Sequence, residues 1–285
     1  MKSIKTHLWM FIFTLWALVG SGIVAPLLGI LFGIEGMYYQ LVLVPALFLP
    51  LCLIYPFIKR GLPVQPYDLK PLSSYDFIWT MIITILFWII FSFLNLLPGL
   101  PMRPLQSFAG YPMWLPIVAA GIVGGTFETL FYHGLLYSDY RNQGITIWHV
   151  AIIVGIFATL IHVHPIQFML ILLTQRIIAV FMMYWMQSIW PAILMNVFVN
   201  VGIISFYFGI VTAENQAVLR LIFGTLSLAA IVTIFFGLKK MKIRYELLLP
   251  NKLTELSQKS FRQTFNWFFW ILAVYWILLY IVFFL

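Results

Sequence analysis

Apolar residues dominate nine long segments of the chain, and short polar stretches separate them. A helix needs about 20 apolar residues to cross the hydrocarbon core of a bilayer. Because lipid offers no hydrogen bonds, a spanning segment must satisfy its own backbone and is expected to be helical. The segments cover residues 8–33, 38–58, 77–99, 114–137, 147–164, 166–186, 189–211, 217–238 and 266–285. The pattern therefore predicts an all-α fold, a polytopic transmembrane helical bundle of about eight or nine spans.

Composition agrees with this fold class. Hydrophobic residues make up 63% of the 285 residues and charged residues only 8%, which is too little charge for a soluble domain. The sequence contains no recognisable internal repeat and no soluble segment, so residues 1–285 are interpreted as a single membrane domain. Cys52 is the only cysteine. This excludes an intramolecular disulfide and a cysteine-based metal site.

The distribution of Lys and Arg predicts the orientation, because cytoplasmic loops are enriched in these residues. If the N-terminus is cytoplasmic, Arg103 and Arg220 fall outside, Arg176 lies within a span, and all other basic residues fall inside. We therefore expect nine spans and an extracytoplasmic C-terminus. The residues assigned to the inside are Lys2, Lys5, Lys59, Arg60, Lys70, Arg141, Lys239, Lys240, Lys242, Arg244, Lys252, Lys259 and Arg262.

Residues 239–265 form the longest polar connection and are predicted to be a cytoplasmic basic loop. Leu253, Leu256, Phe261 and Phe265 stand among Lys and Gln residues there. Two interpretations remain open, an amphipathic helix along the membrane surface or a solvated linker. The net charge of +8 then reflects topology and contact with anionic headgroups of the lipid bilayer, and not nucleic-acid binding.

Glu128 is the acidic residue that lies deep within an apolar segment. An ionisable group inside a membrane costs at least a few kcal/mol, so its first interpretation is functional, as a group that faces a cavity or a partner. Gly124 and Gly125 precede it and would let another helix or a substrate backbone approach closely, and the alternative is that they serve only in packing. The alternative is a protonated Glu128 that is hydrogen-bonded to a neighbouring helix.

Three polar residues of other segments are expected at a similar depth. At about 1.5 Å per residue, Glu128 lies about 14 Å above the inner end of its span and His162 about 22 Å. Asn196 and Asn200 lie at about 10 and 17 Å by the same count, and they share one helix face. Each could serve only in helix association. Together with Glu128 they predict one shared polar site.

Three ordered motifs around these residues resemble those of a known family. Glu128-Thr-Leu-Phe-Tyr-His-Gly134 stands where the family has Glu-Glu-x-x-x-Arg-Gly. Phe157-Ala-Thr-Leu-Ile-His162 resembles Phe-x-x-x-His with one extra residue. Asn196-Val-Phe-Val-Asn200 follows a Trp-Pro helix start, where the family has His-x-x-x-Asn. Over residues 114–205, which we take as the catalytic core, the chain resembles the CPBP family of CAAX proteases and bacteriocin-processing enzymes. That family is also called Abi and includes the type II CAAX prenyl endopeptidases.

The resemblance implies an intramembrane protease and a role for each matching residue. Glu128 and His162 would activate a water for attack on a peptide carbonyl. Asn200, and Asn196 in place of the family histidine, would stabilise the oxyanion. Thr129 and His133 replace the second Glu and the Arg of the first motif and would support the site. His133 is five residues from Glu128, about 140° around an α-helix, so it need not face the same site.

The implied substrate is a lipid-attached or membrane-embedded peptide or protein, and we expect a multi-pass protein of a bacterial cell membrane. A catalytically silent scaffold that binds a partner membrane protein is the main alternative. A small transporter with Glu128 as a proton relay is another, but it would favour internal repeats. No cofactor is expected. A zinc ion held by His162, Glu128 and His133 is the alternative to metal-free general-base chemistry.

Overall fold

The computed structural model describes residues 5–33, 36–58, 69–97, 110–162, 165–211, 214–248 and 260–284. All regular structure in these ranges is helical, which confirms the predicted all-α bundle. The elements are α2 (Leu8–Val19), η1 (Gly20–Val24), α3 (Ala25–Phe32), α4 (Gly36–Ile58), α5 (Ser74–Leu96), α7 (Trp114–Pro116), η2 (Ile117–Gly124), α8 (Gly125–Thr129), η3 (Leu130–Leu136), α9 (Tyr137–Asn142), α10 (Ile147–Leu160), α11 (Ile166–Met186), α12 (Trp190–Gly209), α13 (Gln216–Leu248), α14 (Phe261–Thr264) and α15 (Trp267–Phe284).

Each of the nine apolar segments corresponds to a helical passage. Five passages are long and apolar enough to cross a membrane, namely α5, α11, α12, α13 and the continuous run Trp114–Asn142. Four shorter apolar helices cover Leu8–Val19, Leu41–Tyr55, Ile147–Leu160 and Trp267–Leu279. An integral membrane protein is therefore the class that the fold supports.

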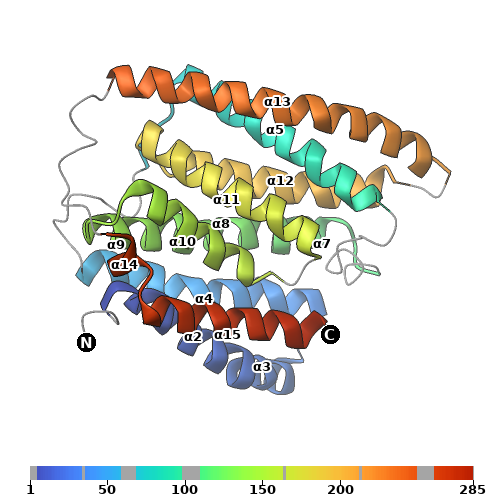
Figure 1. Ribbon diagram of the computed structural model, residues 1–285. Helices are drawn as coiled ribbons and strands as arrows, with labels where there is room; N and C mark the ends of the chain where they lie inside the picture. The colour runs from blue at the N-terminus through green and yellow to red at the C-terminus, as the bar shows by residue number, and fades with distance from the viewer. Residues whose placement is uncertain are drawn as a thin grey trace.

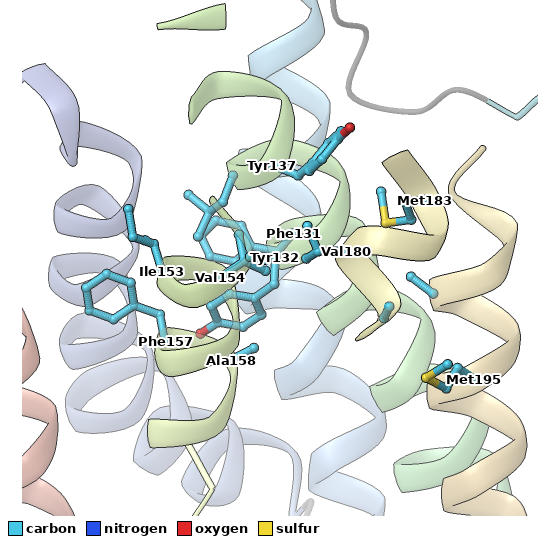
Figure 2. Close-up of a cluster of buried hydrophobic side chains, with 14 of the residues drawn as sticks. Phe131, Tyr132, Tyr137, Ile153, Val154, Phe157, Ala158, Val180, Met183 and Met195 are labelled. Atoms are coloured by element: carbon cyan, nitrogen blue, oxygen red, sulfur yellow. The ribbon is translucent and has the colours of Figure 1, made fainter. Parts of the chain in front are cut away.

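The run from α7 to α9 occupies the middle of the bundle (Figure 1). It packs against α4, α10 and α12, while α5 and α13 pair with each other and α5 also packs on α12. The rings of Phe131 and Tyr132 in the central run pack against Phe13 of α2 and Phe48 of α4, with ring centroids 4.5 to 6.2 Å apart. Figure 2 shows Phe131 and Tyr132 of η3 among Ile153, Val154, Phe157, Ala158, Val180, Met183 and Met195.

Contacts at one end of the bundle join segments that the orientation prediction assigns to one side of the membrane. His7 Nε2 lies 3.0 Å from the carbonyl oxygen of Thr264, and Gln143 donates to the carbonyl oxygen of Thr6 at 3.2 Å. Ser188 donates to the carbonyl oxygen of Lys70 at 2.7 Å. Tyr245 likewise donates to Asp76. These contacts fit alternating passages through a bilayer.

The predicted loop over residues 239–265 is wrong in its first part, because α13 continues to Leu248. Hydropathy falls after residue 238, but Lys, Arg, Glu and Leu all favour the helix and carry it on. Lys242 pairs with Glu246 at 3.6 Å, and the guanidinium of Arg244 lies 4.0 Å from the ring centroid of Tyr75. Leu253 and Leu256 lie outside the described residues, and Phe261 begins α14.

The contacts show which segments share an end of the bundle, and Lys and Arg predict that this end is cytoplasmic. We expect a cysteine at position 242 to react with an impermeant maleimide only after the cytoplasmic face is opened, and a cysteine added after Leu285 to react from outside. Cys52 would first be replaced by Ala, because it is buried and is the only natural thiol. Labelling of both positions from the same face would show that the segment of α15 does not cross the membrane, and would contradict the prediction of nine spans.

Candidate functional site

Glu128 lies in α8, at the centre of the bundle, and is 6% exposed. Small residues let its helix run close to α12. A Cβ added to Gly125 would meet the Cα of Val197 at 3.3 Å, and one added to Gly121 would meet a methyl of Val201 at 2.7 Å. A Cβ on Gly124 would meet the carbonyl oxygen of Ala119 in its own chain segment. Close packing on α12 is therefore the task of Gly121 and Gly125, and among the described residues no other helix lies within 4 Å of a Cβ added to Gly124.

Two π-helical segments, η2 and η3, flank α8 in one continuous helix. A π-turn closes on the fifth residue instead of the fourth, so it rotates later side chains relative to an α-helix, and such turns are frequent at functional sites. His133 lies in η3, is 1% exposed and is close enough to Arg176 for that charge to act on its ring. It therefore lies beside the charged centre. An offset of about 140° from Glu128, as in a plain α-helix, does not require this position.

Arg176 is the partner of Glu128 that the sequence reasoning missed. It lies halfway along α11, is 2% exposed, and its Nη2 donates to Oε1 of Glu128 at 2.6 Å. A buried ion pair of this kind compensates two charges that would each be costly alone. The signal was present in the sequence, because Arg176 is a basic residue within an apolar span. In the prediction of orientation, Arg176 was only the basic residue that falls on neither side of the membrane.

His162 approaches the other carboxylate oxygen of Glu128, with Nε2 3.8 Å from Oε2. Its helix, α10, ends at Leu160 after 14 residues, or about 21 Å, which is shorter than the hydrocarbon core of about 30 Å. One end of such a helix would lie within the hydrocarbon core, where non-helical backbone is tolerated only in contact with protein or water. The side chain of His162 is 27% exposed and that of Glu128 is 8% exposed.

A hydrogen bond sets the orientation of the imidazole. Nδ1 of His162 lies 3.0 Å from the carbonyl oxygen of Ala158. A carbonyl oxygen only accepts, so Nδ1 carries the proton, and in the neutral ring Nε2 presents its lone pair. The lone pair of Nε2 and the carboxylate of Glu128 are then two acceptors 3.8 Å apart. A water molecule has two O–H groups, and this pair of acceptors can bind both.

Asn196 holds α12 against α8. Its Nδ2 donates to the carbonyl oxygen of Gly125 at 2.9 Å and to the hydroxyl of Thr129 at 3.0 Å, and Thr129 in turn donates to the carbonyl of Gly125 at 2.7 Å. A carboxamide has two N–H donors, so both are used in this arrangement. The structure thus brings Asn196 and Thr129 together in a contact between helices, and not in an open donor position.

Asn200 lies one turn further along α12 and donates to the side-chain oxygen of Asn196 at 3.4 Å. This bond uses one of its two N–H groups. The described side chains of the predicted set thus form two connected groups. Glu128 and His162 form a charged group with Arg176, which was not in that set, and Thr129, Asn196 and Asn200 form an amide and hydroxyl group joined to it through the Glu128–Thr129 peptide.

The fold and these residues define an all-helical membrane protein with a buried Glu–Arg–His centre. Residues 109–202 match the family model described as "Type II CAAX prenyl endopeptidase Rce1-like". This confirms the resemblance to the CPBP family that the three motifs indicated, over the segment that contains them. The chain shows no significant match to a curated protein or to a solved structure.

Proposed function

We propose that the protein is an intramembrane endopeptidase that uses Glu128 and His162 to activate a water molecule. The observation that carries the proposal is the placement of two acceptors, Oε2 of Glu128 and Nε2 of His162, 3.8 Å apart inside the family-matched segment. A general base must lie within hydrogen-bond reach of the proton that it removes, directly or through one water. The pair provides such a geometry in a largely buried setting.

The reaction would proceed in two steps. The water oxygen forms a bond to the peptide carbonyl carbon while Glu128 takes one of its protons, and the carbonyl electron pair moves onto the oxygen. The C–N bond then breaks, and Glu128 returns the proton to the leaving nitrogen. His162 accepts the second O–H of the water as a hydrogen bond and fixes the direction of attack. The substrate class supported by the family model is a membrane-associated peptide, with a prenylated C-terminal peptide as the first probe.

The proposed chemistry needs no metal ion. Arg176 donates to Glu128 at 2.6 Å, so a divalent cation on the same carboxylate would lie close to a fixed positive charge. Asn196 is a neutral amide, which suits zinc poorly as a ligand. Among the described residues, no group of three or more His, Cys, Asp or Glu side chains is close enough to hold a metal. The Glu–His pair is therefore proposed to act as general base without zinc.

The test uses the full chain in detergent or liposomes with quenched fluorescent peptides. The panel holds a prenyl-cysteine peptide with three further residues, its unprenylated form, and an apolar transmembrane peptide. We expect His162→Ala to lower the rate by about 10²–10⁴-fold, because the base loses the partner that orients the water. His149→Ala is the matched control, since His149 lies on the same helix and its ring packs against Phe261 and Phe265.

Full activity of His162→Ala would contradict the proposal, as would loss of activity with a chelator and its return with zinc. A second function, the scaffold, is favoured by one observation. The amide donors of Asn196 and one oxygen of Glu128 are committed to contacts within the bundle. A protein that cleaves no member of the panel and keeps its partner complex in the His162→Ala form would be such a scaffold.

A further inference from the structure

The donor that stabilises the oxyanion need not come from the residue that the family motif suggests. Both N–H groups of Asn196 are engaged, one with the carbonyl of Gly125 and one with Thr129. Using either for a substrate oxygen would break a contact that holds α12 against α8. A hydrolytic site still requires donors where negative charge develops, since this is usually the largest electrostatic contribution to catalysis.

Arg176 offers such donors next to the proposed base. A guanidinium carries five N–H groups, and among the described residues Arg176 uses one, from Nη2 to Oε1 of Glu128. Its Nε is buried and has no hydrogen-bond partner among those residues. The Nε–H and one N–H of Nη2 point to the same edge of the planar group, so the unused donor lies on the nitrogen that shares an edge with the one bonded to Glu128. An acceptor oxygen next to Glu128 would meet this edge.

The charges of the reaction fit this position. Before attack, Glu128 is the anion that compensates Arg176 in the buried pair. When Glu128 accepts the proton of the water it becomes neutral, and a buried guanidinium would then lack a counter-ion, which is costly. At the same moment the carbonyl oxygen of the substrate becomes negative. An oxyanion on the unused edge of Arg176 restores the pair, so the total charge of the site stays the same throughout.

We infer that Arg176 is a catalytic residue, an oxyanion donor of the proposed peptidase, and that Asn196 is a structural contact between helices. The inference rests on the proposed function. It assigns α11 a direct part in the reaction, although the three motifs that carry the family resemblance lie on the central run, on α10 and on α12. Arg176 loses its anionic partner when Glu128 is protonated, and the same side chain then gains the oxyanion as its partner.

The test is Arg176→Lys, which keeps a cation beside Glu128 and removes the planar donor edge. We expect kcat to fall by about 10²–10³-fold, as for loss of one oxyanion donor, with KM unchanged because the contact forms only in the transition state. Affinity for a peptidyl phosphonate, a tetrahedral anion, should fall by a similar factor, while affinity for the uncleaved peptide stays the same. A residue with a purely structural role would not separate the two affinities.

Arg141→Lys is the matched control, because Arg141 is also a buried arginine, 8% exposed, which donates to the carbonyl oxygen of Ile145 at 2.8 Å away from the site. The inference would be overturned if Arg176→Lys kept the wild-type kcat and phosphonate affinity while Glu128→Gln was inactive. The proposed peptidase activity would still stand in that case. A wild-type protein that cleaves no probe, with Glu128→Gln indistinguishable from it, would overturn both. If the lysine form does not fold, the phosphonate affinity of Glu128→Gln/Arg176→Gln is compared with that of Glu128→Gln alone, and an equal affinity would overturn the inference.

Discussion

Replacing Glu128 with Gln is expected to lower kcat by about 10²–10⁴-fold at an unchanged amount of folded protein. Gln has the shape of Glu, and its side-chain oxygen can still accept the hydrogen bond from Nη2 of Arg176. It cannot take a proton from water at neutral pH, so the attack loses its base. Initial rates with the cleaved probe, normalised to the folded fraction, measure the effect.

Glu246→Gln is the control for this substitution. Glu246 is an exposed carboxylate on α13 that pairs with Lys242 at 3.6 Å, so its amide form should keep the wild-type rate. In cells the same pair of variants separates enzyme from scaffold. A phenotype that is lost on deletion of the protein but kept by Glu128→Gln at normal protein level would remove the peptidase from consideration in favour of the scaffold.

Replacing Arg176 with Leu is expected to destabilise the fold by about 3–5 kcal/mol, because it leaves the carboxylate of Glu128 buried without its counter-ion. The double variant Glu128→Leu/Arg176→Leu should recover most of that loss, since no charge then remains at the centre of the bundle. Neither variant is expected to be active. Denaturant unfolding of purified protein in one detergent, followed by the quenching of tryptophan, gives the free energies.

The cycle formed by the two single variants and the double variant isolates the pair interaction. We expect strong coupling, with the double variant more stable than the sum of the single effects predicts. Additive losses would show that Glu128 and Arg176 do not pair in the folded protein. Leu is apolar and of similar length to the aliphatic part of both side chains, which keeps the packing loss small relative to the charge effect.

Much of the fold could be read from the sequence, because a bilayer admits few ways to satisfy a backbone. Nine apolar segments were predicted and nine helical passages are present among the described residues. The ends of the segments were less accurate. The segment over 147–164 stops as a helix at Leu160, and the one over 217–238 continues to Leu248. Hydropathy measures the preference of a side chain for lipid or water, and it does not show where the backbone hydrogen bonds of a helix end.

The candidate site was partly predictable for a related reason. Glu128 and His162 were expected to meet because isolated polar groups in lipid need partners, and their side chains lie 3.8 Å apart. Arg176 was not assigned to them, because the motif comparison directed attention to other helices. His133 was expected to support the site from the motif alone, because the π-turns of η3 change the angular spacing and leave no recognisable mark in the sequence. The catalytic roles themselves remain predictions.

The turn that carries His162 has a consequence for the depth of the site in the bilayer. Asn196 packs on the α12 side of the helix that carries Glu128, and the imidazole of His162, 27% exposed, is the more exposed member of the Glu128–His162 pair. His162 follows the end of α10 at Leu160, whereas Gln143 precedes the start of that helix at Ile147. If the N-terminus is cytoplasmic, as Lys and Arg predict, the proposed peptidase would place its Glu128–His162 pair in the outer half of the bilayer.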